Sequence, residues 1–148
     1  MKSSNAMEDF KRNISYHVRR NDDQIILTAN LKDHFHDIRM EVLADFESLA
    51  ITAARVSFLR HPTEDCPNVA WRMEHLVGFT IGRGLNKKLQ ETFGGGEGCG
   101  NLRVMLLGLL PLAMNVKAAA GFTDEGKMLD SIRERLVGSC AGYVKRPE

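Results

Sequence analysis

The first half of the chain alternates apolar and polar residues with the period of two that a strand with one buried face requires. This alternation runs through residues 14–19, 25–32 and 37–42, and Asn21-Asp22-Asp23 supplies turn chemistry between the first two runs. Residues 49–59 read as a fourth strand, whose alternation slips at Ala53-Ala54 and predicts a bulge. Because the connections are short, we expect an antiparallel meander with one apolar face that needs a cover.

The second half carries helical patterns instead. Pro67 suits the first turn of a helix, since its missing N–H has no intrahelical partner there. The apolar residues that follow recur at helical spacing, and Gly82 and Gly84 are predicted to end that helix. The recurring residues of this helix after Pro67 are Val69, Met73, Leu76 and Val77. A second, short helix is predicted over Leu85–Phe93.

Two further helices are predicted after a glycine-rich loop. The first runs from about Asn101 to Ala120, is apolar nearly all round and should kink at Pro111. Such a helix is either central and buried or an oligomer contact. Asp124-Glu125 then opens an amphipathic helix. Its predicted inward residues are Met128, Leu129, Ile132 and Leu136, with Arg133 and Arg135 outward.

These elements define the fold class as α+β. We expect an antiparallel meander of about four strands in the N-terminal half, covered by three to four helices from the C-terminal half. Residues 10–148 then form one domain, because no linker or internal repeat divides them. Residues 1–9 are expected to be a cloning remnant and a disordered start, with a native start at Met7.

Composition narrows the class of protein. Twenty Lys and Arg residues nearly balance nineteen Asp and Glu residues, so we expect no nucleic-acid partner. The longest apolar stretch, Val104–Met114, is eleven residues, against the roughly 20 that a membrane span needs, so we expect no membrane partner either. The chain has only three cysteines, and this small, odd number does not suggest a disulfide framework. It favours a reducing, cytoplasmic location.

Cys66 and Cys99 are the strongest candidates for chemistry. Both lie where irregular chain gives way to a helix, and a helix N-terminus favours a thiolate that can bind a metal or attack an electrophile. The alternative is that both are small core hydrophobes, the commonest fate of free cysteine. The usual zinc spacings are absent.

Histidines and glycines supply further candidates. His34 and His36 would share one face of a strand, where such a pair can bind a metal or simply form a polar surface. His61, five residues before Cys66, is another candidate ligand. The glycine run that leads to Cys99 can cradle an anion at a helix N-terminus, but no Lys-Ser/Thr follows, and a turn between helices is favoured.

The order of these motifs resembles a bacterial family, the domain of unknown function 2889. The resemblance covers roughly residues 10–120 and rests on His36-Asp37, Cys66, Leu76-Val77-Gly78, Ile81-Gly82-x-Gly84, Phe93-Gly94-Gly95 and Gly98-Cys99-x-x-Leu102. That family usually shows Gly-Cys-Thr-His-Leu, which with a second cysteine looks like a metal site. This chain has Asn101 in place of the histidine.

The layout is also similar to that of NifU-type iron–sulfur cluster scaffold proteins. Those proteins place cysteines at comparable strand-to-helix and loop-to-helix junctions, and Cys66 and Cys99 would match two of their ligand positions. The third cysteine is not matched. The cofactor stays open between zinc and iron or an iron–sulfur cluster, and the likeness implies the cluster.

Three functions therefore stay open. The first is a metal- or cluster-binding module that uses Cys66 and Cys99 with His36 or His61. The second is a small-molecule-binding protein or enzyme with a pocket near Cys99. The third is an interaction domain that forms a homodimer through the helix Leu102–Met114. The polar groups predicted for the second function are Gly98, Asn101, Arg103, Arg83 and His36.

Overall fold

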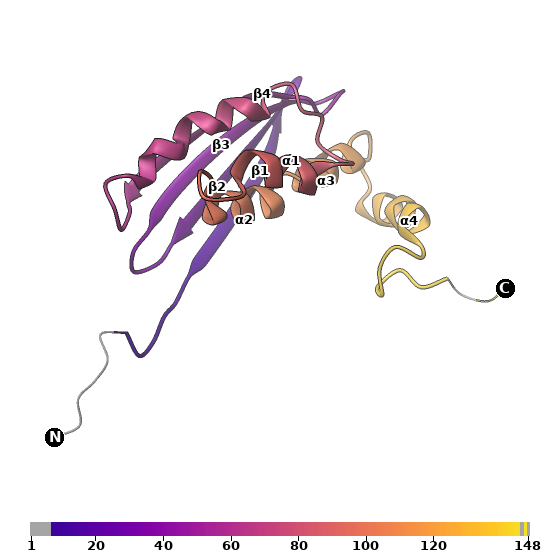
Figure 1. The fold of residues 1–148 in the computed structure, drawn as a ribbon. Coiled ribbons are helices and arrows are strands. Elements are labelled where there is room, and N and C mark those ends of the chain that lie inside the picture. Colours follow the sequence, from indigo (N-terminus) through magenta and orange to yellow (C-terminus); the bar gives the residue numbers. More distant parts are fainter. Residues whose placement is uncertain (1–6, 146, 148) are drawn as a thin grey trace.

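A computed structural model describes residues 7–145 and residue 147, and within them a run of strands precedes a run of helices (Figure 1). The strands are β1 (Asn13–Asn21), β2 (Gln24–Lys32), β3 (Asp37–Asp45) and β4 (Ile51–Arg60). The helices are the 3₁₀ helix η1 (Cys66–Leu76), α1 (Leu85–Phe93), α2 (Gly100–Leu109), α3 (Leu112–Ala119) and α4 (Glu125–Leu136). The predicted α+β class is confirmed. Of the segment 1–9, predicted to be a cloning remnant and a disordered start, residues 1–6 lie outside the described residues.

The strands form one antiparallel sheet in the order β1-β2-β3-β4, which is the predicted meander. The register between β3 and β4 shifts so that Thr52 is an extra residue between the partners of Leu43 and Ala44. This bulge reverses the odd–even alternation, and therefore both Ile51 and Val56 point to the core. The bulge at Thr52 is the physical cause of the break in alternation that the sequence shows in this strand.

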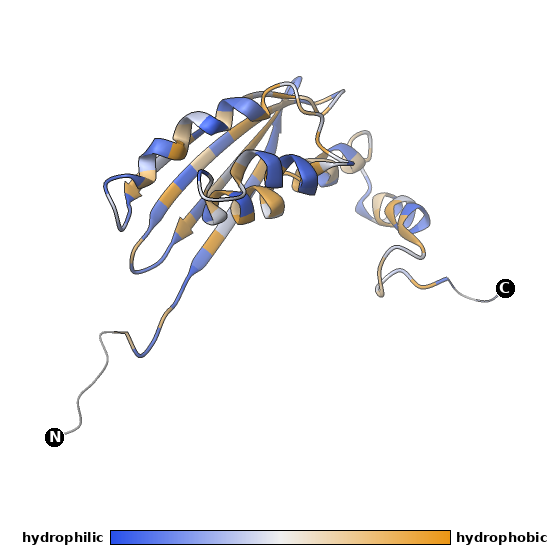
Figure 2. Ribbon diagram, viewed as in Figure 1, coloured by the Kyte–Doolittle hydropathy of each residue, from blue (hydrophilic) through white to orange (hydrophobic). Residues whose placement is uncertain are grey.

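Helices cover one face of the sheet, and the other face stays open to solvent (Figures 1 and 2). The covered face contributes every second residue of β2 and β3, and the helices add their apolar stripes. Burial of this apolar surface is the main force that holds the two layers together. Large side chains at its centre are Leu27, Leu31, Ile38, Met73, Leu76, Leu89, Phe93, Leu102, Met105 and Leu106.

Where the sequence predicted one helix with a kink at Pro111, the apolar segment forms two helices, α2 and α3, because Pro111 removes a backbone donor at that point. α2 lies close to β1 because Gly108 has no side chain: a Cβ there would come within 2.2 Å of the Tyr16 hydroxyl. Three apolar side chains of the segment stay exposed: Val104, Leu107 and Met114. The homodimer through this face stays a prediction.

Taken as one run of 20 residues, 100–119 is long and apolar enough to cross a membrane. The eleven residues counted from the sequence therefore underestimated the length of this apolar run. A third of its most apolar window is buried inside the protein. The inward face of the run, which includes Leu102, Leu106 and Leu109, packs in the core of the sheet–helix sandwich. A core helix passes the same test of length and hydropathy as a membrane span.

Two helix predictions need correction. The helix after Pro67 ends at Leu76 and not at Gly82–Gly84, because Gly78 turns the chain with a φ of +92° and residues 78–81 then run beside the start of β4. The last helix begins as predicted, with Asp124 accepting a hydrogen bond from the Lys127 amide. Of its predicted inward residues, Met128 and Ile132 are half-buried and none is fully buried. Leu129 is 53% exposed and Leu136 is exposed as well, so the prediction that these two residues point inward is wrong.

Candidate binding site

A cavity of about 390 Å³ opens at the end of the sheet where β3 begins. We call it the His36 cavity. Its walls come from the start of β3, the end of β4, the start of η1 and the loop that leads into α2. The residues that line it are His36, Ile38, Phe58, Thr63, Asp65, Cys66, Asn68, Val69, Gly96, Glu97, Gly98, Cys99 and Asn101.

Cys66 and Cys99 meet in this cavity although 33 positions separate them in the sequence. Both are free and half-buried, and Cys99 also packs against the hydrophobic core. The Cys66 sulfur lies 3.3 Å from the Thr63 hydroxyl, which holds it at the start of η1. Cys140 lies beyond α4 and is exposed. Both cysteines singled out from the sequence therefore line one cavity.

Gly98 fixes the position of Cys99. A Cβ at Gly98 would lie 1.9 Å from the backbone oxygen of Phe93, a distance that no side chain tolerates. The close approach lets the Cys99 amide donate to that same oxygen at 3.0 Å. The loop between α1 and α2 is thus a tight turn that delivers Cys99 and Asn101 to the cavity.

Asp33 organises the opposite wall. It follows β2 directly, and its Oδ1 accepts hydrogen bonds from the backbone amides of Phe35 and His36, each at 2.8 Å. This arrangement is an Asx-type turn, in which a short carboxylate replaces backbone partners. The same oxygen lies 2.9 Å from Nδ1 of His36. The Asp33 carboxylate therefore sets both the turn and the orientation of the imidazole.

The Asp33 side chain is fully buried, yet its carboxyl group is more acidic than that of an ordinary aspartate. Burial raises the pKa of this carboxyl group, but hydrogen bonds from His36, Phe35 and Arg12 outweigh it and lower the pKa to about 2. Asp33 is consequently ionised at neutral pH. Arg12 completes the charge balance, since its Nε lies 2.8 Å from Asp33 Oδ2.

Arg12, Asp33, His36 and Asn101 form a closed ring of hydrogen bonds. Arg12 donates from Nε to Asp33 and from Nη1 to Oδ1 of Asn101, the second at 3.0 Å. Nδ2 of Asn101 in turn lies 3.3 Å from Nε2 of His36. The ring ties the segment before β1 to the β2–β3 turn and to the start of α2.

Several predicted residues lie at the cavity. His36, Cys66, Cys99, Gly98 and Asn101 all line it.

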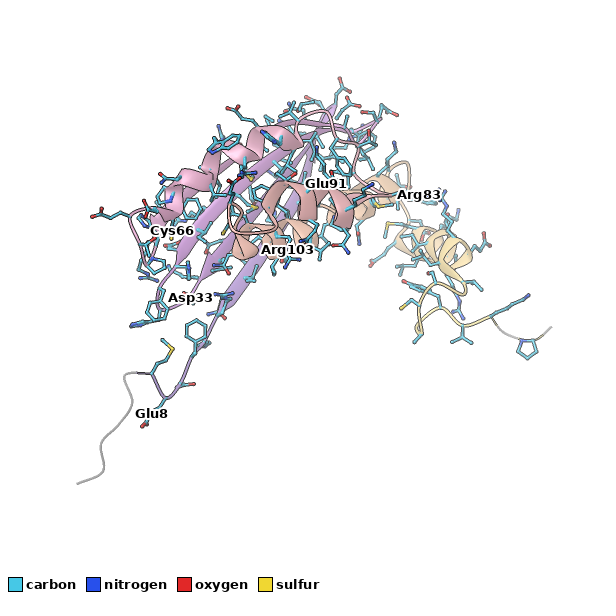
Figure 3. All side chains as sticks on the ribbon, viewed as in Figure 1. Glu8, Asp33, Cys66, Arg83, Glu91 and Arg103 are labelled. Carbon is cyan, nitrogen blue, oxygen red and sulfur yellow. The ribbon has the colours of Figure 1, made fainter. Side chains whose placement is uncertain are left out.

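Other predicted residues do not. His61 bonds through Nδ1 to the Thr63 carbonyl oxygen at 2.6 Å and is not part of the wall, and Arg103 and Arg83 are not part of it either. Figure 3 shows Asp33 and Cys66 at one end of the sheet and Arg83 at the other. The strand placement of His34 is wrong, because His34 and His36 lie in the turn between β2 and β3 and His34 is exposed.

Sequence reasoning missed Arg12 and Asp33. An aspartate directly after a strand and three residues before a histidine is a turn signal that points to Asp33. Arg12 carries no such signal, since its partners lie 21 and 89 positions away.

The residues present do not fit a metal centre. Within the part of the chain that the structure describes, no group of three or more His, Cys, Asp or Glu side chains is placed to hold a metal ion. Both nitrogens of His36 are engaged, one by Asp33 and one by Asn101. A structural zinc site needs four ligands and a catalytic site three, and the two thiols alone do not supply them.

Fold and site together define an α+β domain with a thiol- and imidazole-lined cavity at one end of its sheet. The chain belongs to a family described as protein of unknown function (DUF2889), whose profile matches residues 10–115. The match spans the sheet, η1, α1, α2 and half of α3, and so includes the whole His36 cavity. No curated protein and no solved structure matches the chain, so the likeness to NifU-type scaffolds gains no support from these comparisons.

Proposed function

We propose that this protein binds a small organic molecule in the His36 cavity. The observation that carries the proposal is the convergence of His36, Cys66 and Asn101 on one cavity from three separate segments of the chain. Binding sites commonly combine a few convergent polar groups with apolar walls.

The size and lining of the cavity support a small ligand. A volume of about 390 Å³ lies at the lower end of the range for ligand pockets, roughly 300–1,000 Å³. Ile38, Phe58 and Val69 supply an apolar wall against which a hydrocarbon or ring can pack. His36 and Asn101 supply polar groups whose positions are fixed by the hydrogen-bonded ring. A preorganised wall of this kind lowers the entropy cost of binding.

Native mass spectrometry of the full chain, purified without denaturation, tests the proposal. Asn68→Trp should fill the cavity from its exposed side, and Asn86→Trp on α1 is the matched control because Asn86 is exposed and does not line the cavity. We expect a retained small molecule on the wild type and on Asn86→Trp, and none on Asn68→Trp.

A fragment screen followed by amide chemical shifts covers the case in which the natural ligand is lost during purification. Binding fragments should then shift the signals of Ile38, Val69 and Cys99. A wild-type protein that retains nothing and binds no fragment at these residues contradicts the proposal.

A further inference from the structure

The hydrogen-bonded ring fixes where the protons of its members lie. A guanidinium group has only donors, so the Asn101 atom that faces Arg12 is the side-chain oxygen. The amide NH₂ of Asn101 therefore faces His36, and an NH₂ group can only donate. Nε2 of His36 must accept this hydrogen bond and carries no proton.

The other side of the imidazole gives the same answer. Asp33 is ionised and can only accept, so Nδ1 of His36 carries the proton and donates it at 2.9 Å. Each donor in the ring meets one acceptor, and the arrangement is self-consistent. His36 is thus held as a neutral imidazole whose lone pair points toward Asn101, at the wall of the cavity.

The charge of the cavity limits what can approach this lone pair. Among the described residues that line it, none is a lysine or an arginine. The ionisable side chains on the wall besides His36 and the two thiols are Asp65 and Glu97, both exposed. Glu97 forms an ion pair with Arg72, whose Nη2 lies 3.0 Å from the Glu97 carboxylate, so the acidic charge left for a ligand is mainly that of Asp65. Arg12 is held behind Asn101, with its charge matched by Asp33. An anionic ligand would therefore meet the negative charge of Asp65 without a cation on the wall to offset it, whereas a cationic ligand would find Asp65 as a countercharge and a neutral ligand would meet no repulsion.

We infer that the ligand of the His36 cavity is a neutral or cationic molecule with an N–H or O–H group that takes the place of the Asn101 amide on Nε2 of His36. This inference rests on the proposed function and names the chemical class of its ligand. The Asn101 amide marks the position of the incoming donor, since it occupies the acceptor in the free protein. The apolar wall of Ile38, Phe58 and Val69 then takes the remainder of the molecule.

Long-range ¹H–¹⁵N NMR of the imidazole signals at pH 8 tests the free protein without any ligand. The two nitrogens of a neutral imidazole differ clearly in ¹⁵N shift according to which one carries the proton. We expect a protonated Nδ1 and an unprotonated Nε2 for His36, with the signal assigned by its loss in His36→Gln. A proton on Nε2, or on both nitrogens, overturns the inference.

Three probes of similar size test the ligand class: benzyl alcohol is a neutral donor, benzylamine a cationic donor, and benzoate an anion without a donor. We expect both donors to shift the His36 and Ile38 signals and to bind about tenfold more tightly than benzoate. Equal or tighter binding of benzoate at these residues overturns the inference while the binding function stands. If none of the probes and no other fragment reaches these residues, both proposals fail together.

Comparison of Asn101→Ala with Asn68→Ala distinguishes the release of Nε2 of His36 from a mere increase in the volume of the cavity. Both substitutions enlarge the same cavity by the same side chain, but only Asn101 bonds to His36. We expect benzyl alcohol to bind on the order of fivefold more tightly to Asn101→Ala, because the competing amide is gone, and to show no such gain with Asn68→Ala. An equal effect of the two substitutions contradicts displacement of the Asn101 amide.

Discussion

Nδ2 of Asn101 lies 3.3 Å from Nε2 of His36, although the two residues are 65 positions apart in the sequence. The contact joins the start of α2 to the turn between β2 and β3, and Arg12 and Asp33 close it into a ring. In the part of the chain that the structure describes, the Asn101 amide thus engages the His36 nitrogen that faces the cavity.

Asp33→Asn should weaken the fold in a way that depends on pH. The pKa of Asp33 falls from its ordinary value of 3.8 to about 2 in the folded protein, so its ionised form stabilises the fold above pH 3.8, and this contribution is lost as the pH falls toward 2. For this buried group it amounts to about 2 kcal/mol. Urea unfolding of the wild type and of Asp33→Asn should differ most at pH 5 and above and converge near pH 2.

Asp22→Asn is the control for that series, because Asp22 lies exposed in the turn between β1 and β2. It should track the wild type at every pH. A constant difference between the wild type and Asp33→Asn down to pH 2 would show that the carboxylate is not the source of the stability.

Gly98→Ala should distort the loop that presents Cys99. The new methyl group meets the Phe93 backbone, which cannot move away like a flexible side chain, and we expect a loss of at least about 2 kcal/mol in the free energy of unfolding. Gly96→Ala is the matched control in the same loop, since a Cβ there meets nothing within 4 Å. It should change stability by less than about 1 kcal/mol. Comparable losses in both variants would contradict the role given to Gly98.

The three thiols should react with iodoacetamide at different rates. Cys140 is exposed and should be alkylated about tenfold faster than Cys66 and Cys99, which are half-buried in the His36 cavity. Peptide mass spectrometry over a time course measures the three rates separately. A cavity ligand should slow Cys66 and Cys99 and leave Cys140 unchanged, and slowing of Cys140 as well would indicate a general effect on the protein.

Asn101→His should introduce metal binding. The substitution adds an imidazole to a wall that already holds Cys66, Cys99 and His36, and it removes the amide that engages His36. Titration with Co²⁺ should give thiolate charge-transfer absorption in Asn101→His only. Asn101→Gln keeps an amide and is the control. Equal absorption in the wild type would mean that the thiols bind metal without a further imidazole.

Removal of residues 122–148 should leave the domain folded. α4 has no buried residue, and the match to the family ends at residue 115, before this helix. We expect the melting temperature to change by less than about 4 °C, measured by circular dichroism. A larger fall would show that α4 stabilises the core through contacts with α3.

Local patterns along the sequence were enough to place most of the elements. Alternation in β2 and β3 marked one apolar face, and Leu85, Leu89 and Phe93 marked α1 at its observed bounds, because residues near one another in sequence decide periodicity. α4 shows the boundary of this reasoning. Its amphipathic pattern formed the predicted helix, but only the rest of the structure decides whether a stripe is covered.

For the candidate site, too, some features follow from local sequence and others only from tertiary structure. The sequence by itself determined that Cys66 and Cys99 lie at starts of helices, since proline and glycine set those starts locally. Only the tertiary structure decided that the two thiols share a cavity and that Arg12 and Asn101 take up the polar groups around His36. Hydrogen bonds between residues far apart in the chain depend on how the layers pack, and no local pattern encodes that packing.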